Sequence, residues 1–398
     1  MRGRRRRLFA LAACAFAGGL AVLGAAGCRS MGEKPAGDEL ARIESSPQWR
    51  DGRFQNVQPM WGNAAHALLN AFDNPPEVSP SQPVPVVRTD PAVLAAAPPS
   101  GLRVTWFGHS SSLIEIDGVR VLCDPIWSER ASPFEWFGPK RWYPPTIALD
   151  ALPPVDAVFV SHDHYDHLDM RTILAMKAWK SVFVVPLGVG QHLRYWGIPP
   201  ERIVELDWWQ STRLGAVTLT LTPSRHHTGR VSPQSDRTLW GGAALVGPAH
   251  RAWYSGDTGL LDAMTDIGER LGPFDVALVE SGQYDADWPD WHLGPEQAVI
   301  AARRVRAKAM VPVHWGLFQL AHHAWTEPVE RVLAAAQCAG QPVLTPRPGQ
   351  PVEPTTLSPA GTPRWWPAIA WHTASEKPVV ATRDGDASHR VAPLACGA

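Results

Sequence analysis

Apolar positions in this sequence occur in short runs separated by Gly, Pro and polar residues. Short runs rich in Val, Ile, Leu and Phe predict β-strands, whereas apolar positions with helical spacing predict helices. We therefore expect strands at residues 102–107, 112–116, 119–123, 155–160, 181–185, 202–206, 217–222, 239–246, 251–254, 276–279 and 309–313. We expect helices at residues 169–179, 188–196, 295–306 and 327–339.

The expected elements fall into two similar halves, each of strands and then helices. This order is typical of layered folds in which helices cover sheets. The sequence therefore predicts an α/β protein with a four-layer αββα sandwich. Polar residues follow several strands directly, namely the cluster at 161–167 and then His226, Asp257 and His314. Side chains at strand ends gather at one edge of a sheet, where layered folds place their active sites.

The cluster at 161–167 reads Ser-His-Asp-His-Tyr-Asp-His. Imidazole and carboxylate are the ligands of zinc and related divalent ions. Two ions are expected, because the first two histidines can face one ion whereas the last two residues lie a further turn along. We assign His162, His164 and His226 to the first ion, and Asp166, His167 and His314 to the second. The two carboxylate oxygens of Asp257 suit it to bridge both ions.

Other interpretations of these positions are open. The cluster could be a polar loop without metal, Asp257 a turn residue, and His314 a satisfied core histidine. His109 and Asp124 are expected to support the site rather than to bind metal. We expect Asp163 to be a solvated loop residue and Asp169 to cap a helix.

Further motifs carry a family resemblance. They are residues 106–110 (Trp-Phe-Gly-His-Ser), 127–133 (Trp-Ser-Glu-Arg-Ala-Ser-Pro), 256–259 (Gly-Asp-Thr-Gly) and 314–316 (His-Trp-Gly). Together with the histidine cluster they make residues 102–340 resemble metallo-β-lactamase-fold hydrolases. Within that superfamily the sequence is similar to the N-acyl-phosphatidylethanolamine-hydrolysing phospholipase D group and its bacterial relatives.

This resemblance implies two zinc ions and a bridging hydroxide that attacks the phosphorus of a phosphodiester. It also implies that His226, rather than His227, is the metal ligand. His292 matches a histidine that contacts substrate, where it would bind phosphate or protonate the leaving group. We therefore predict a di-zinc, phospholipase D-like metallohydrolase that cleaves phosphodiesters of phospholipids, with Asp166, Asp257 and His292 as catalytic residues. Other divalent metals, such as iron or manganese, are alternatives to zinc.

Two other functions are compatible with the sequence. The same fold and metals could hydrolyse a lactone, a β-lactam or an amide, or a non-enzymatic envelope protein could use the fold as a scaffold. A complete ligand set argues against the scaffold. The net charge of −1 argues against a nucleic-acid partner.

The two ends of the chain differ in composition from the predicted hydrolase domain at 101–346. Residues 1–28 have a basic region, an apolar stretch and then Ala-Ala-Gly-Cys, which predicts a signal that is cleaved before a lipidated Cys28. An ordinary signal peptide is the alternative. Export to the bacterial periplasm or cell envelope and membrane attachment follow from this prediction. We expect residues 29–100 to be a Pro-rich tether or packing extension, and residues 347–398 to be a peripheral Pro-rich tail.

Overall fold

The computed structural model describes residues 27–69, 74–230, 235–356, 363–392 and 394. Its strands are β1 (Trp49–Arg50), β2 (Arg53–Phe54), β3 (Leu102–Gly108), β4 (Ser111–Ile116), β5 (Val119–Cys123), β6 (Ala157–Phe159), β7 (Val182–Pro186), β8 (Ile203–Leu206), β9 (Ser211–Leu214), β10 (Val217–Thr222), β11 (Gly242–Val246), β12 (Arg251–Tyr254), β13 (Val276–Glu280), β14 (Met310–Val313) and β15 (Pro351–Val352). Its helices are α2 (Asp38–Glu44), α3 (Ala64–Leu69), α4 (Pro91–Ala95), α5 (Met170–Ala175), α6 (Val189–Tyr195), α7 (Ala263–Arg270), α8 (Pro295–Arg304) and α9 (Glu327–Ala339).

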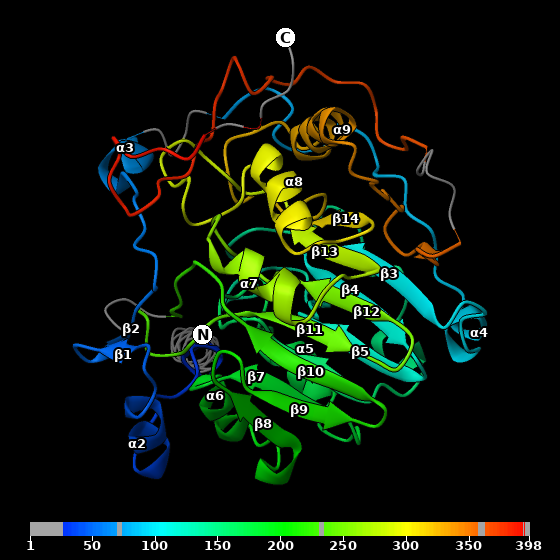
Figure 1. Cartoon of the computed structure of the whole chain (residues 1–398). Coiled ribbons are helices and arrows are strands. Elements are labelled where there is room, and N and C mark those ends of the chain that lie inside the picture. Colours follow the sequence, from blue (N-terminus) through cyan, green and yellow to red (C-terminus); the bar gives the residue numbers. More distant parts are fainter. Residues whose placement is uncertain (1–26, 70–73, 231–234, 357–362, 393, 395–398) are drawn as a thin grey trace, which may run out of the picture.

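The larger strands form two mixed sheets in the middle of the molecule (Figure 1). The first sheet has the order β15-β3-β4-β5-β6-β7-β8, and its strands from β5 to β8 run parallel. The second sheet has the order β14-β13-β12-β11-β10-β9, and β12, β13 and β14 run parallel. Parallel strands end at the same edge of a sheet, so both sheets bring several loops together at one edge.

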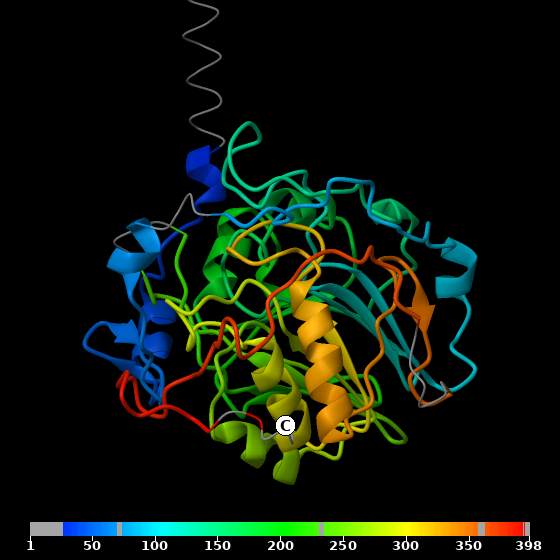
Figure 2. The same cartoon turned by 90° about the horizontal axis from the view of Figure 1, so that it is seen from above.

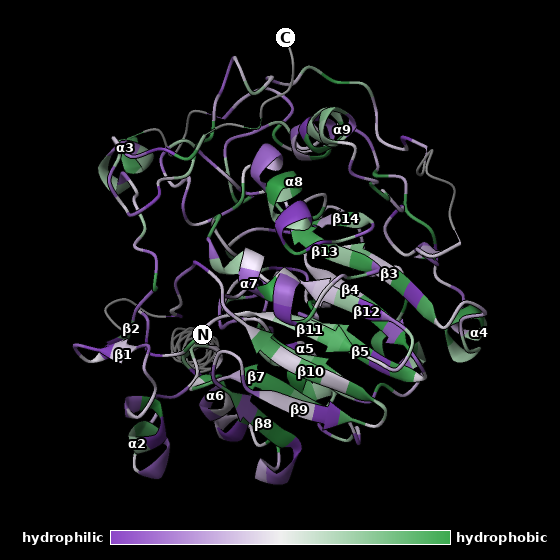
Figure 3. Cartoon of the chain, viewed as in Figure 1, coloured by the Kyte–Doolittle hydropathy of each residue, from purple (hydrophilic) through white to green (hydrophobic). Residues whose placement is uncertain are grey.

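Apolar side chains fill three layers, which explains why the strands are apolar on both faces. Figure 3 shows many residues of the two sheets in green, the colour of hydrophobic residues. In β13, Val276 and Leu278 point between the two sheets, whereas Ala277 and Val279 pack against the helices α7, α8 and α9. The outer face of the first sheet packs against α5 and α6 in the same way. Figure 2 shows α8 and α9, in yellow and orange, on one side of the sheets. The predicted αββα sandwich is confirmed.

Most expected elements are present with shifted ends. The strand expected at 155–160 is β6, and the helix expected at 169–179 is the shorter α5. The sequence did not predict β9, β15 or α7. Strand β9 lies at a sheet edge and has a single apolar residue, Leu214, and α7 is a short helix in which polar residues interrupt the apolar ones, so neither has a strong apolar run.

The segments on either side of the hydrolase domain pack closely against it. Phe54 in the extension is buried, and so are Trp365, Trp366 and Ala381 beyond residue 347. The expectation of a peripheral tail is therefore wrong for these residues, because the two tryptophans pack in the apolar layer against Trp315, Trp365 by stacking and Trp366 edge-on. The domain boundaries themselves stay a prediction. Among the described residues, no helix has the length and apolar character needed to cross a membrane.

Candidate metal centre

Three histidine rings from two loops converge at the edge where the strands end. His162 and His164 follow β6, and His226 lies after β10. The Nδ1 atom of His164 lies 2.9 Å from His162 Nε2 and 3.4 Å from His226 Nε2. These nitrogen atoms are close enough together to bind one ion. The structure therefore brings together the three residues that we assigned to the first ion.

A second group lies beside the first and contains the other predicted ligands. The Oδ2 atom of Asp166 is 3.4 Å from both His167 Nε2 and His314 Nε2. His109 joins this group, because its Nε2 atom lies 2.8 Å from the same carboxylate oxygen. Burial lowers the pKa of His109 to about 4. The ring is therefore neutral near pH 7 and donates its Nε2–H to Asp166, which agrees with the supporting role expected for it.

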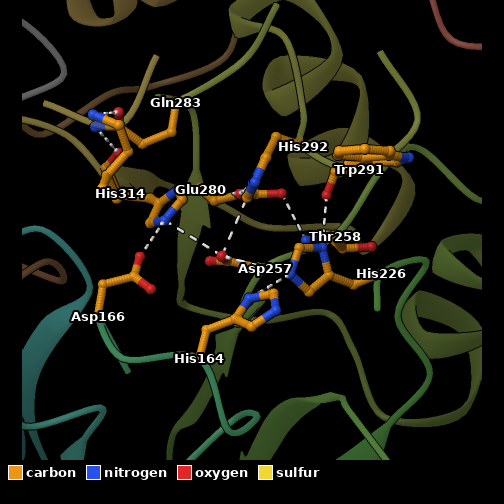
Figure 4. A network of polar contacts seen from close by, with 12 residues as sticks. His164, Asp166, His226, Asp257, Thr258, Glu280, Gln283, Trp291, His292 and His314 are labelled. Carbon is orange, nitrogen blue, oxygen red and sulfur yellow. Dashed lines mark hydrogen bonds and ion pairs between the residues drawn. The ribbon is translucent and has the colours of Figure 1, made fainter. Parts of the chain in front are cut away.

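Asp257 lies between the two groups, directly after β12 (Figure 4). Its Oδ2 atom is 3.1 Å from His167 Nε2 and 3.2 Å from His314 Nε2. The same oxygen is 3.8 Å from the Nε2 atoms of His162 and His226. One carboxylate thus faces histidines of both groups, which is the arrangement that two neighbouring metal ions sharing a carboxylate require.

A second layer of hydrogen bonds fixes the orientation of the rings. Asp124, at the end of β5, accepts a hydrogen bond from His167 Nδ1 at 2.6 Å and others from the backbone and hydroxyl of Ser161. The carbonyl of Trp291 lies 2.8 Å from His226 Nδ1. The Asn56 side chain binds both the N–H and the C=O of His226. Such partners fix which ring nitrogen is free to bind metal.

Three residues of this region have left-handed backbone. The φ angles of His109, Asp124 and His314 are 51°, 41° and 66°. Residues other than glycine rarely adopt such angles, and the exceptions are concentrated at functional sites.

Asp163 and Asp169 are not part of the centre. Asp169 caps α5, as expected. Asp163 is buried rather than solvated, contrary to the expectation, and accepts a hydrogen bond from Gly229 N–H.

His292 reaches the centre from the segment before α8. Its Nδ1 atom is 2.9 Å from Glu280 Oε2 and 3.8 Å from Asp257 Oδ2, and its side chain keeps 15% of its exposure. Glu280 is fully buried at the end of β13 and also lies 3.2 Å from His314 Nδ1. It accepts hydrogen bonds from the N–H groups of Thr258 and Leu293. Glu280 thus contacts one predicted ligand and the predicted substrate histidine.

The donor set fits divalent metal ions. In the described part of the chain, the buried atoms without a hydrogen-bond partner include His167 Nε2 and Asp257 Oδ1, both of which face the centre. Burial by itself lowers the pKa of His314, but the carboxylates of Asp257, Asp166 and Glu280 outweigh it and raise this pKa to about 10. The centre therefore stabilises positive charge. Two groups of imidazole and carboxylate donors around a shared carboxylate match the requirements of zinc.

All seven predicted metal ligands and His292 lie together, and three further residues of the site had no role in the sequence analysis. Glu280 follows a buried strand directly, so the rule that led to Asp257 and His314 also applies to it. Asn56 and the Trp291 carbonyl carry no such signal, because neither residue follows an apolar run of the sequence or belongs to a metal-binding motif.

The family is established by comparison with known proteins. Residues 119–315 match the beta-lactamase superfamily domain. A metal-dependent hydrolase from Pyrobaculum aerophilum is 30% identical over 55% of this chain and 86% of its own length. The chain belongs to the β-lactamase superfamily. It is a metal-dependent hydrolase of the metallo-β-lactamase fold, as the resemblance implied.

This metallo-β-lactamase-fold protein is also similar to other known proteins. An uncharacterised protein of Mycobacterium tuberculosis is 47% identical over 81% of this chain and 88% of its own length. The N-acyl-phosphatidylethanolamine-hydrolyzing phospholipase D 1 of Caenorhabditis elegans is 36% identical over 56% of this chain, which spans 65% of the worm protein. A solved metallo hydrolase from Ignicoccus hospitalis shares the fold with a TM-score of 0.50 and 23% identity, over 63% of this chain and 97% of its own.

Proposed function

We propose that this protein is a di-zinc phosphodiesterase that acts on phospholipids. The position of Asp257 carries the proposal, since its Oδ2 atom faces histidines of both groups at 3.1–3.8 Å. The similarity to the worm phospholipase D supports the substrate class. Water would add to phosphorus and the bond from phosphorus to one alcohol oxygen would break, which gives a phosphomonoester and a free alcohol.

The proposed roles of the residues follow from their positions. His162, His164 and His226 would hold one zinc ion, Asp166, His167 and His314 the other, and Asp257 both. When bound, the two ions supply a water of lowered pKa and neutralise charge on the phosphoryl oxygens. Glu280 accepts the Nδ1–H of His292, which leaves Nε2 as the ring nitrogen for substrate. There it would bind a phosphoryl oxygen or protonate the departing alcohol.

We also propose that the protein is exported and anchored to the cell envelope through Cys28. The basic and apolar composition of residues 1–28 supports this location. Cys28 is exposed and has a free thiol. Cys338 is disulfide-bonded, and disulfides persist mainly in oxidising compartments outside the cytosol.

Turnover by the zinc-loaded full chain tests the phosphodiesterase. We expect hydrolysis of the soluble diester bis(p-nitrophenyl) phosphate and of phosphatidylethanolamine in vesicles, and two zinc ions per chain by elemental analysis. Asp257→Asn should lower kcat by about a hundredfold or more, because it weakens the carboxylate that both ions share. Asp262→Asn, which changes an exposed carboxylate five residues along, is the matched control.

A parallel panel of a lactone, a β-lactam and an amide separates the proposal from its alternatives. Faster turnover of any of these than of both phosphodiesters would contradict the proposed substrate. Fewer than one ion per chain after loading with zinc would contradict the metal centre itself.

A further inference from the structure

Residues 129–141 form a projecting loop with aromatic side chains at its tip, which we call the aromatic finger. Trp136 and Phe137 are 63% and 65% exposed. The ring centroids of Phe134 and Trp136 lie 5.3 Å apart, and those of Trp136 and Phe137 lie 6.0 Å apart. An exposed cluster of large apolar rings on a soluble surface usually marks an interaction site.

Hydrogen bonds hold the finger in this exposed position. At its base, Ala131 N–H donates to the Pro139 carbonyl at 3.0 Å, and Arg141 N–H donates to the Glu129 carbonyl at 2.9 Å. The Arg130 guanidinium donates to the carbonyls of Glu135 and Gly138, on either side of the aromatic tip. The rings are therefore displayed by a braced loop, and their exposure is part of the fold.

The start of the described chain lies against this finger. In the uncleaved chain, Gly27 packs on the Phe134 ring so closely that any side chain at position 27 would overlap it, which places the adjoining Cys28 beside the finger. The next residue, Cys28, is exposed. Figure 2 shows the first helical turn of the described chain, in blue, beside the blue-green loop that carries the finger, at the same side of the molecule. The residue proposed to carry the lipid anchor thus lies at the foot of the exposed aromatic cluster.

Residues next to Cys28 and to the finger are connected by hydrogen bonds to the loop that carries the predicted metal ligands. Arg230 donates to the carbonyl of Ser30 and also to those of Asp163 and Leu168, at either end of the histidine-rich segment. On the other side, the backbone N–H and hydroxyl of Ser128 bind the Asp169 carboxylate, which caps α5 directly after that segment. The finger and Cys28 are thus each connected, through a neighbouring residue and its hydrogen bonds, to the loop that carries the predicted metal ligands.

We propose that the aromatic finger and Cys28 form one docking face for a lipid bilayer. Tryptophan favours the membrane interface, and tryptophan and phenylalanine together form the apolar faces that enter the boundary between headgroups and acyl chains. The charges around the tip are paired, Lys140 with Glu129 and Arg171 with Glu135, so they suit a polar headgroup layer. The anchor holds the protein at the membrane, and the finger fixes its orientation. Delivery of a phospholipid to the metal centre by this face rests on the proposed activity, and the part of Cys28 rests on the proposed anchor, whereas contact of the aromatic finger with the bilayer rests on neither.

Vesicles of phosphatidylethanolamine and phosphatidylglycerol test the docking with the full chain. Hydrogen–deuterium exchange at residues 129–141 should slow when vesicles are added. The double variant Trp136→Ser, Phe137→Ser should lose this protection and hydrolyse vesicle phospholipid about tenfold more slowly, since it removes two large apolar contacts. Its turnover of bis(p-nitrophenyl) phosphate should match that of the wild type, because the finger does not touch the metal centre.

The matched control is Leu68→Ser, Leu69→Ser, which removes two exposed apolar side chains from α3. This variant should behave as the wild type in both assays. Exchange at residues 129–141 that is unchanged by vesicles would overturn the docking face. Protection that appears only with native membranes would also overturn it, because the finger would then bind a membrane protein rather than the lipid. If the wild type hydrolyses neither diester, the proposed function fails while the exchange measurement still decides the docking.

Discussion

At the scale of single residues, Glu280 links the predicted substrate histidine to the metal ligands. Its carboxylate lies 2.9 Å from His292 Nδ1 and 3.2 Å from His314 Nδ1, and it is fully buried. A buried carboxylate in this position selects the tautomer of His292 through a hydrogen bond and favours positive charge on His314. The residue is therefore as important to the geometry as the ligands that it supports.

Replacement of Glu280 by Gln tests this role. We expect kcat for bis(p-nitrophenyl) phosphate, or the affinity for zinc, to fall by about ten- to a hundredfold, because an uncharged amide supports the His292 tautomer and the positive charge on His314 less well. Steady-state kinetics and zinc titration measure both quantities. Glu296→Gln is the control, since Glu296 binds Arg331 away from the centre. Equal activity and zinc affinity in the wild type and Glu280→Gln would contradict the role.

At the scale of elements, the side chains that gather in the candidate metal centre could be picked out from the sequence, because each follows a strand whose apolar run is easy to recognise. The segment at 161–167, His226, Asp257 and His314 all come after such runs. Their division into two groups followed from the spacing within one loop. The part that Asn56 plays was not predictable, because it depends on how the extension packs against a residue 170 positions away in the sequence.

The loops that follow β13 and β14 are joined by a buried histidine. His323 Nε2 accepts a hydrogen bond from Gln283 N–H at 2.9 Å, and its Nδ1 lies 3.0 Å from the Ala324 carbonyl. Burial lowers the pKa of His323 to about 4 from 6.5. The folded protein therefore keeps this ring neutral, because a proton on Nε2 would displace the hydrogen bond from Gln283.

This pKa predicts acid sensitivity with a definite sign. Between about pH 6.5 and pH 4 the unfolded chain binds a proton at His323 that the folded chain does not, so the free energy of unfolding falls as the pH falls. The loss from this residue should be about 2 kcal/mol at about pH 5. Urea unfolding at about pH 7 and pH 5 measures it. In His323→Gln, which keeps an acceptor for Gln283, the loss should be smaller by that amount; an identical loss would contradict the prediction.

At the scale of the whole molecule, one buried ion pair joins segments from both ends of the chain to the metal centre. Arg225 binds Asp290 through two nitrogens, each 3.0 Å from a carboxylate oxygen. Asp290 also accepts hydrogen bonds from Trp61 N–H and Thr382 N–H, at 2.7 Å each. The sequence showed the sandwich but not this junction, since no local pattern relates residues so far apart.

Asp290→Asn should destabilise the whole protein and also weaken its metal site. The substitution leaves the buried Arg225 charge without its carboxylate, which should cost about 3–5 kcal/mol of unfolding free energy. Arg225 directly precedes His226, so zinc affinity should fall together with stability. Urea unfolding with and without zinc measures both effects. Asp384→Asn, at an exposed carboxylate near Thr382, should change stability by less than about 0.5 kcal/mol. If Asp290→Asn were as stable as this control, the ends of the chain would not be held through the ion pair, and the extension and tail would pack on the sandwich independently of its metal centre.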